Sequence, residues 1–180
     1  ASDIDPSTHA VYQKNHGMTP HGDIYKIKDE RIPEHDILCA GFPCQAFSHA
    51  GKHLGFDDAR GVLFLEIIRF VRARKPKILA LENVPGLIKH DGGRTFETIT
   101  NAIRAEGYVV HHTLAKASDY GLPQMRRRVL FLCIRDDIPH DPATVLDFTH
   151  RENRDVTMRD LLDRNYEKRY AYTIRCGGRR

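Results

Sequence analysis

The sequence has 180 residues, 41% of them hydrophobic and 29% charged, which is enough for one globular domain with a sizeable core. No apolar run approaches the ~20 residues that cross a bilayer, which argues against an integral membrane protein. The net charge of +4 is uneven: residues 1–60 hold 6 Lys/Arg against 9 Asp/Glu, and the remainder holds 22 against 15. The basic part suits a polyanionic partner, although solvated helix faces would give the same composition.

The four cysteines are Cys39, Cys44, Cys133 and Cys176, and none form a Cys-x-x-Cys pair. A zinc site and a disulfide framework are therefore not expected, and the pattern favours a reducing compartment. Cys39 and Cys133 lie in apolar runs, which predicts small core residues. Cys44 differs because its neighbours are turn formers.

The first predicted elements are a helix and a buried strand. Residues 5–15 have a helical pattern, with Asp5 as the candidate N-cap, Pro6 at the first helical position and Gly17 at the end. Residues 36–40 form a short apolar run that Gly41 closes, which is typical of a buried strand.

Two helices and three strands follow. Apolar side chains at helical spacing predict a helix that stops at residues 75–76: Phe64, Ile67, Ile68 and Val71. Residues 78–81 are the next buried strand, which ends at Glu82. A second amphipathic helix ends near Gly107 and carries Phe96, Ile99 and Ile103. Residues 108–114 and 129–134 are predicted strands.

Strands that alternate with helices predict an α/β domain with a largely parallel sheet. In such sheets, ligands bind outside the carboxyl ends of the strands. Cys44 and Glu82 both follow or close a predicted strand, so we expect them near one ligand site.

Three short motifs carry candidate chemistry: Gly41-Phe42-Pro43-Cys44-Gln45, Glu82-Asn83-Val84 and Gln124-Met125-Arg126-Arg127-Arg128. A thiol with a pKa of ~8.5 needs a helix N-terminus or an arginine nearby to become a nucleophile. A carboxyl at the end of an apolar strand is expected in a desolvated place, where it becomes a usable proton donor. Strand alternation puts Arg126 and Arg128 on one face. Taken singly, each motif could also be an inert loop cysteine, a solvent-facing carboxylate or a solvated basic run.

These motifs occur in the order, and near the spacing, found in DNA (cytosine-5)-methyltransferases, and residues 1–136 resemble that family. The resemblance implies a Rossmann-like S-adenosylmethionine-dependent methyltransferase fold, incomplete at both ends. It implies that Cys44 attacks carbon 6 of a flipped cytosine in duplex DNA. It also implies that Glu82 contacts ring nitrogen 3 and the exocyclic amine. By resemblance, Arg126 and Arg128 complete the catalytic set, and Arg128 stabilises charge on the base carbonyl.

The same resemblance implies a site for S-adenosylmethionine. Asp3 matches the family residue that binds the ribose hydroxyls, and Ile4 matches the one that packs on adenine. In Gly22-Asp23-Ile24, Asp23 matches the acceptor for the adenine amino group, and Ile24 accompanies it. Two further matches line the methionine end: Pro43 and Leu63.

DNA contacts are implied for Ser48, Lys52 and Arg60, because residues 46–63 resemble the glycine-rich loop that closes over DNA. Residues 1–136 correspond to the central part of the catalytic domain, residues 137–157 to a connector, and residues 158–180 to the start of the target-recognition region, where Arg175 is a further DNA contact. The family's opening glycine-rich motif is expected before Ala1, so a complementary chain could supply the missing motifs.

Other functions stay open on the sequence alone. A variant of the family methylates cytosine in transfer RNA. A non-catalytic subunit of a split methyltransferase is also compatible with the motifs. An unrelated thiol hydrolase would need a histidine paired with Cys44, and the candidates lie in no recognisable pattern: His49, His53 and His90. The resemblance to the methyltransferase family implies a protein of the bacterial cytoplasm that associates with the nucleoid and belongs to a restriction–modification system.

Overall fold

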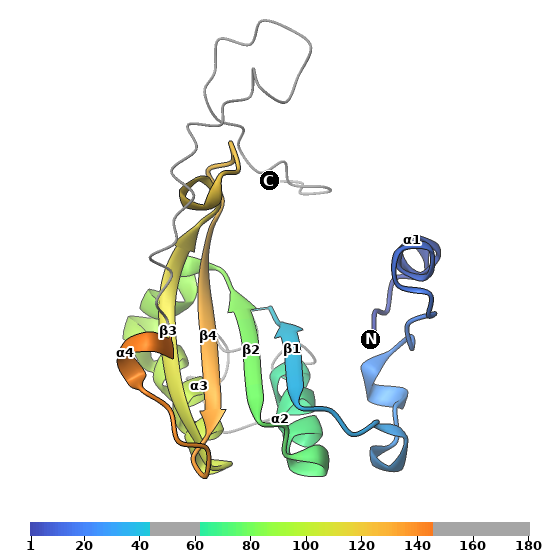
Figure 1. Cartoon of the computed structure of the whole chain (residues 1–180), viewed down its shortest axis with the longest axis horizontal. Helices are drawn as coiled ribbons and strands as arrows, with labels where there is room; N and C mark the ends of the chain where they lie inside the picture. The colour runs from blue at the N-terminus through green and yellow to red at the C-terminus, as the bar shows by residue number, and fades with distance from the viewer. Residues whose placement is uncertain (44–61, 146–180) are drawn as a thin grey trace, which may run out of the picture.

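The computed structural model describes residues 1–43 and 62–145 of the chain (Figure 1). The helices are α1 (Pro6–His16), α2 (Val62–Arg74), α3 (Arg94–Ala105) and α4 (Pro142–Val145). The strands are β1 (Ile37–Gly41), β2 (Ile78–Asn83), β3 (Tyr108–Lys116) and β4 (Arg127–Arg135). Short 3-10 segments are η1 (Ile24–Lys26), η2 (Asp29–Arg31), η4 (Pro85–Gly93) and η5 (Ala117–Tyr120).

The four described strands form one sheet in the order β1-β2-β4-β3. β1 and β2 are parallel, whereas β4 is antiparallel to both of its neighbours. The expectation of a largely parallel sheet is therefore wrong for the described strands. The reason lies in the connections: α2 provides the crossover that a parallel pair requires, but β3 returns into β4 through the short segment 117–126.

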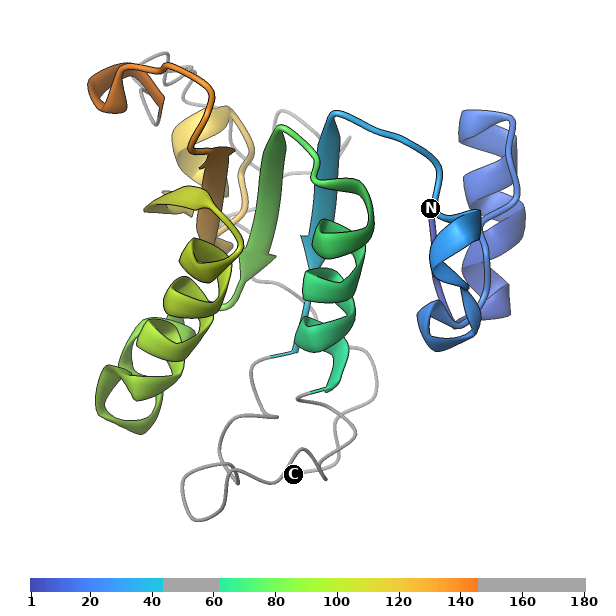
Figure 2. The same cartoon turned by 90° about the horizontal axis from the view of Figure 1, so that it is seen from below.

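Helices α2 and α3 cover one face of the sheet (Figure 2). The α2 residues predicted from helical spacing are all buried, and they pack on the alternate β2 residues Leu79 and Leu81. Tyr108 at the start of β3 is buried, and its hydroxyl donates a 2.5 Å hydrogen bond to the carbonyl of Pro76. Burial raises the pKa of Tyr108 to about 12.

The opposite face of the sheet is less covered. Ile37 in β1 is 54% exposed and Val109 in β3 is 39% exposed. Cys39 is also exposed, so the prediction that it is a core residue is wrong, whereas Cys133 is buried as expected. Alternation explains the difference, because α2 packs against the β1 residues that point to its own side and Cys39 points to the other.

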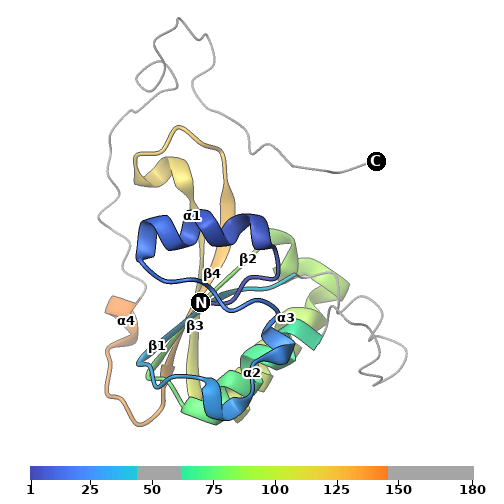
Figure 3. The same cartoon turned by 90° about the vertical axis from the view of Figure 1, so that its right-hand side faces the viewer.

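The N-terminal segment stands beside β1 at one edge of the molecule (Figures 1 and 3). Helix α1 has the predicted caps: the carboxylate of Asp5 accepts a 2.9 Å hydrogen bond from the amide of Ser7, and Gly17 is left-handed with φ 71°. None of the described residues of α1 is buried. Within residues 1–43 and 62–145, no helix has the length and apolar character to cross a membrane.

Candidate active site

The carboxyl ends of β1 and β2 meet the start of β4 at one end of the sheet. Glu82, the penultimate residue of β2, lies opposite Gly41 of β1 and Leu130 of β4. Its carboxylate forms an ion pair with the guanidinium of Arg128, and its Oε1 atom lies 3.7 Å from an Nη2 atom of Arg126. Arg128 lies in β4 and Arg126 immediately precedes it, and both reach Glu82 from one side, as alternation predicts, while Arg127 between them is exposed.

The side chain of Glu82 is 39% exposed, and those of Arg126 and Arg128 are 38% and 24% exposed. The expectation of a desolvated Glu82 is therefore wrong for this chain, because alternation from the buried Leu81 and Asn83 puts Glu82 on the less covered face of the sheet. The pair of arginines beside the carboxylate gives it a fixed direction, and the exposure leaves room for a ligand against it. Such a cluster can bind a polar planar group and exchange a proton with it.

Asn83 joins the two strand ends. Its side chain is nearly fully buried, and its Nδ2 atom donates a 2.8 Å hydrogen bond to the carbonyl of Phe42. Its Oδ1 atom accepts a 2.8 Å hydrogen bond from the amide of Val84. Phe42 is itself buried against Phe64 of α2, with ring centroids 5.3 Å apart. The backbone that leads into Pro43 is therefore held from both sides.

Gly41 brings this turn close to the acidic side chain. A Cβ atom at Gly41 would lie 3.4 Å from the Oε2 atom of Glu82, so any side chain larger than a methyl would crowd the carboxylate. Sequence reasoning treated Gly41 as a strand terminator and gave it no part in the site. Gly41 ends a strand and directly precedes Phe42, and this position could have indicated a close approach to the neighbouring strand end.

The two segments proposed for the cofactor are brought together by main-chain contacts. Ser2 and His21 form a parallel bridge, and the amide of Asp3 donates a 2.9 Å hydrogen bond to the carbonyl of His21. The hydroxyl of Ser2 donates a 2.7 Å hydrogen bond to the carbonyl of Gly22. Ile4 and Asp23 directly follow these contacts along the chain, so their backbone positions are close to each other.

The side chains of these segments fit a nucleoside. Asp3 accepts a 2.9 Å hydrogen bond from the amide of Asp5 through one oxygen, and Asp23 accepts a 3.0 Å bond from the amide of Tyr25. Each carboxylate has a second oxygen with which it can accept a ligand donor. Ile4 is 73% exposed beside them, which leaves an apolar surface for a flat base.

The remaining predicted residues divide by position. Pro43 is exposed at the turn after β1, and Leu63 on α2 is partly buried against the core. Other predicted site residues lie outside the described residues: Cys44, Ser48, Lys52, Arg60 and Arg175. In the part of the chain that the structure describes, no group of three or more His, Cys, Asp or Glu side chains could hold a metal ion.

Comparison with known proteins shows the family of the chain. The family model described as C-5 cytosine-specific DNA methylase matches residues 1–176. The chain belongs to this family. It is 55% identical over 129 residues to the type II methyltransferase M1.ScrFI of Lactococcus lactis subsp. cremoris, covering 72% of this chain and 33% of that protein. It is 46% identical over 178 residues to the type II methyltransferase M.MspI of Moraxella sp, covering 96% of this chain and 42% of that protein.

Solved structures of methylases show the same fold. A putative DNA modification methyltransferase encoded within an E. coli prophage matches 77% of this chain and 41% of its own, with a TM-score of 0.61 and 26% identity. The S. pombe Dnmt2 methyltransferase matches with a TM-score of 0.59 and 22% identity, covering 78% of this chain and 44% of its own. The chain thus has a Rossmann-like methyltransferase fold and spans about a third to a half of the length of the relatives that it matches.

Proposed function

We propose that this chain provides the catalytic centre of an enzyme that methylates carbon 5 of cytosine in duplex DNA with S-adenosylmethionine, through a covalent cysteine adduct. The observation that carries the proposal is the junction of the strand ends. There Glu82 pairs with Arg128, and Asn83 holds the turn that leads into Cys44. A nucleophile and an acid delivered by neighbouring parallel strands can both reach one flipped base.

The proposed chemistry begins with the thiolate of Cys44, which adds to carbon 6 of a flipped cytosine. Glu82 protonates ring nitrogen 3, so that the electron pair of the ring double bond becomes available at carbon 5. Arg128 neutralises charge on the base carbonyl, and Arg126 helps to hold the carboxylate. After methyl transfer, water takes the proton from carbon 5, and the electron pair of that bond re-forms the ring double bond and expels the thiolate. Ring nitrogen 3 returns its proton to Glu82, which restores the aromatic ring.

S-adenosylmethionine supplies the electrophilic methyl group when it is bound. Asp3 is proposed to accept from the ribose hydroxyls, and Asp23 from the adenine amino group, with Ile4 and Ile24 against the base. This assignment is supported by the hydrogen bonds that bring residues 2–3 against residues 21–22. Pro43 and Leu63 are proposed to line the methionine end.

A complementary polypeptide is proposed to complete the enzyme. Apolar side chains are exposed both on the N-terminal segment and on β1: Ile4, Val11, Met18 and Ile37. In the described sheet, β1 pairs with β2 on one edge, and its other edge has no strand among the described residues. An apolar surface next to a free strand edge favours a segment that adds strands and packs on this face.

The test measures transfer of tritiated methyl groups to duplex DNA, by the chain alone and after the flanking regions of a relative are added as a separate polypeptide. We expect turnover only in the complemented sample, at DNA and not at transfer RNA. Multiple turnover by the chain alone would refute the need for a complement. Methylation of transfer RNA in place of DNA would overturn the proposed substrate.

A further inference from the structure

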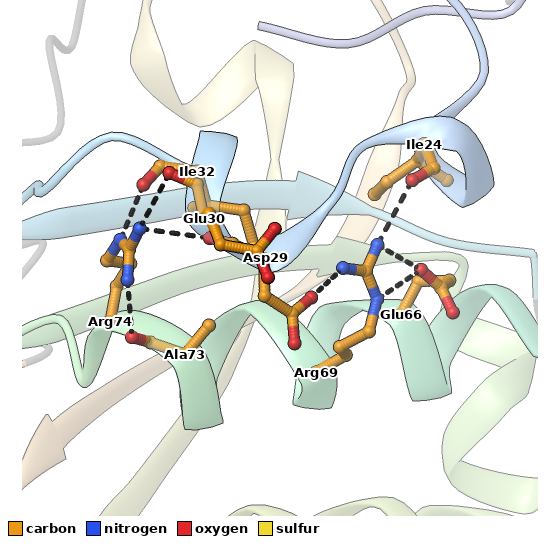
Figure 4. A network of polar contacts seen from close by, with 8 residues as sticks. All are labelled: Ile24, Asp29, Glu30, Ile32, Glu66, Arg69, Ala73 and Arg74. Atoms are coloured by element: carbon orange, nitrogen blue, oxygen red, sulfur yellow. Dashed lines mark hydrogen bonds and ion pairs between the residues drawn. The ribbon is translucent and has the colours of Figure 1, made fainter.

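Arg69 on α2 connects the helix to the segment that carries the proposed adenine site (Figure 4). Its Nη2 atom donates a 3.1 Å hydrogen bond to the carbonyl of Ile24, and its Nη1 atom forms an ion pair with Asp29. Its Nε atom donates a 2.7 Å bond to Glu66, one turn earlier on the same helix. The guanidinium therefore makes three directed contacts, and two of them reach the N-terminal segment.

Apolar packing does little to hold this segment in place. None of the described residues in α1, η1 or η2 is buried. Among the described residues before Ile32, only Pro20 is buried, and Ile32 lies eight residues beyond Ile24 along the chain. Hydrogen bonds from α2 therefore contribute to the position of η1, because a segment whose one buried residue before Ile32 is Pro20 has few apolar contacts to keep it there.

Two arginines of α2 make these bonds, and they reach different places. Arg74 donates to the carbonyls of Asp29 and Ile32, at 2.9 Å and 2.5 Å, near the end of the segment. Arg69 reaches Ile24 itself, next to Asp23, whose carboxylate caps η1. Of the two, Arg69 is thus the one that fixes the direction in which Asp23 presents its carboxylate.

We propose that Arg69 is a positioning residue for the adenine of the cofactor: its fork of donors locks the Ile24 carbonyl and so aims Asp23 at the exocyclic amino group. The inference rests on the proposed function, in which Asp23 accepts from that amino group. The inference goes further, because adenine recognition would depend on Arg69 of α2, which is 45 residues from Ile24 along the chain. Lysine cannot replace this fork, because a single ammonium group does not present the planar set of donors that reaches Ile24, Asp29 and Glu66 together.

The experiment uses the chain with its complement and compares Arg69→Ala and Arg69→Lys with Arg72→Ala. Arg72 lies on the same helix but is exposed and pairs with Glu106, away from the N-terminal segment. For both Arg69 variants we expect the KM for S-adenosylmethionine to rise about tenfold, with kcat and the KM for DNA within about twofold of wild type. Arg72→Ala is expected to change none of these constants.

A second measurement separates positioning from general loosening. Dissociation constants are measured for S-adenosylhomocysteine and for its inosine analogue, which lacks the amino donor. We expect wild type to bind the analogue about tenfold more weakly, and Arg69→Ala to lose most of this difference, since a misplaced Asp23 no longer reads the amino group. A difference of equal size in both proteins would overturn the inference and leave the proposed function intact. Failure of wild type to bind either nucleoside would overturn the proposed function, and the inference with it.

Discussion

The Nδ2 atom of Asn83 lies 2.8 Å from the carbonyl oxygen of Phe42 and donates a hydrogen bond to it. The contact crosses from the end of β2 to the residue just after β1, two positions before Cys44 along the chain. Asn83 therefore fixes the spacing between the backbone that leads into the nucleophile and the strand that carries Glu82. Both groups of the proposed reaction depend on this one buried amide.

Asn83→Ala is expected to lower turnover at least tenfold and to destabilise the fold by about 1–3 kcal/mol, because the buried Phe42 carbonyl loses its donor. Methyl-transfer kinetics and thermal unfolding of the complemented enzyme measure the two effects. Asn101→Ala is the matched control, since Asn101 is exposed on α3 and bonds only to Arg104 among the described residues. Wild-type turnover in Asn83→Ala would show that the contact has no part in catalysis.

Glu82→Gln is expected to reduce kcat by roughly 10²–10⁴, since glutamine keeps the shape of the side chain but cannot transfer the proton. Binding of duplex DNA should change little, because the base is also held by Arg128 and by the surrounding protein. Single-turnover kinetics and a DNA-binding titration give the two quantities, with the exposed Glu97→Gln as control. Equal losses in rate and in DNA affinity would assign Glu82 to binding and not to proton transfer.

The pair His111–His140 predicts a pH dependence of stability. The Nε2 atoms of the two rings lie 3.0 Å apart, and the Nδ1 atom of His140 lies 2.9 Å from the carbonyl of Ile138. His140 must therefore carry its proton on Nδ1 and accept through Nε2 from a neutral His111. Burial, and then the nearby His140, lower the pKa of His111 below its ordinary value of 6.5.

Since the unfolded chain binds this proton more readily than the folded chain, stability is complete above about pH 6.5 and is lost as the pH falls through the lowered pKa. We expect the thermal unfolding midpoint to decrease when the pH is lowered from 7.5 to 5.5. The decrease should be smaller in His111→Gln than in wild type. His16→Gln, on the exposed surface of α1, is the control and should follow wild type. The same slope in His111→Gln as in wild type would remove His111 as the cause.

The positions of two thiols on the sheet predict different reactivity. Cys39 is exposed on the uncovered face, whereas Cys133 is buried and its pKa is raised to about 12 by desolvation. Brief alkylation by iodoacetamide, followed by peptide mass mapping, should modify Cys39 in the chain alone and leave Cys133 intact until unfolding. Addition of the complement should protect Cys39. Equal modification of both thiols in the folded chain would contradict the described faces of the sheet.

Sequence reasoning found the elements because their signals are local. The helical spacing of Phe64, Ile67 and Val71 predicted α2, and all three side chains are buried in the core. The direction of β4 was missed, because pairing order depends on which strands meet after folding and not on the composition of one strand. Cys39 was misplaced for a related reason, since an apolar run does not reveal which of its two faces will be covered.

The candidate site divides in the same way. The motif around Glu82 predicted a strand-end carboxylate, and the run at residues 124–128 predicted Arg126 and Arg128 on one side; both arginines lie against Glu82. The sequence could not predict that the carboxylate would be 39% exposed, which depends on which face of the sheet the helices cover. Arg69 carries no local signal at all, because its contact with Ile24 joins residues far apart along the sequence.

The most direct test of the account is covalent trapping of the complemented enzyme on duplex DNA that contains 5-fluorocytosine, in the presence of S-adenosylmethionine. After addition of the Cys44 thiolate and methyl transfer, the fluorine on carbon 5 cannot leave as a proton does, so the thiolate is not expelled. The account predicts a denaturation-resistant adduct that maps to Cys44 and is absent in Cys44→Ser, whose hydroxyl is far less ionised near neutral pH. Methylation without an adduct, or an adduct that persists in Cys44→Ser, would contradict it.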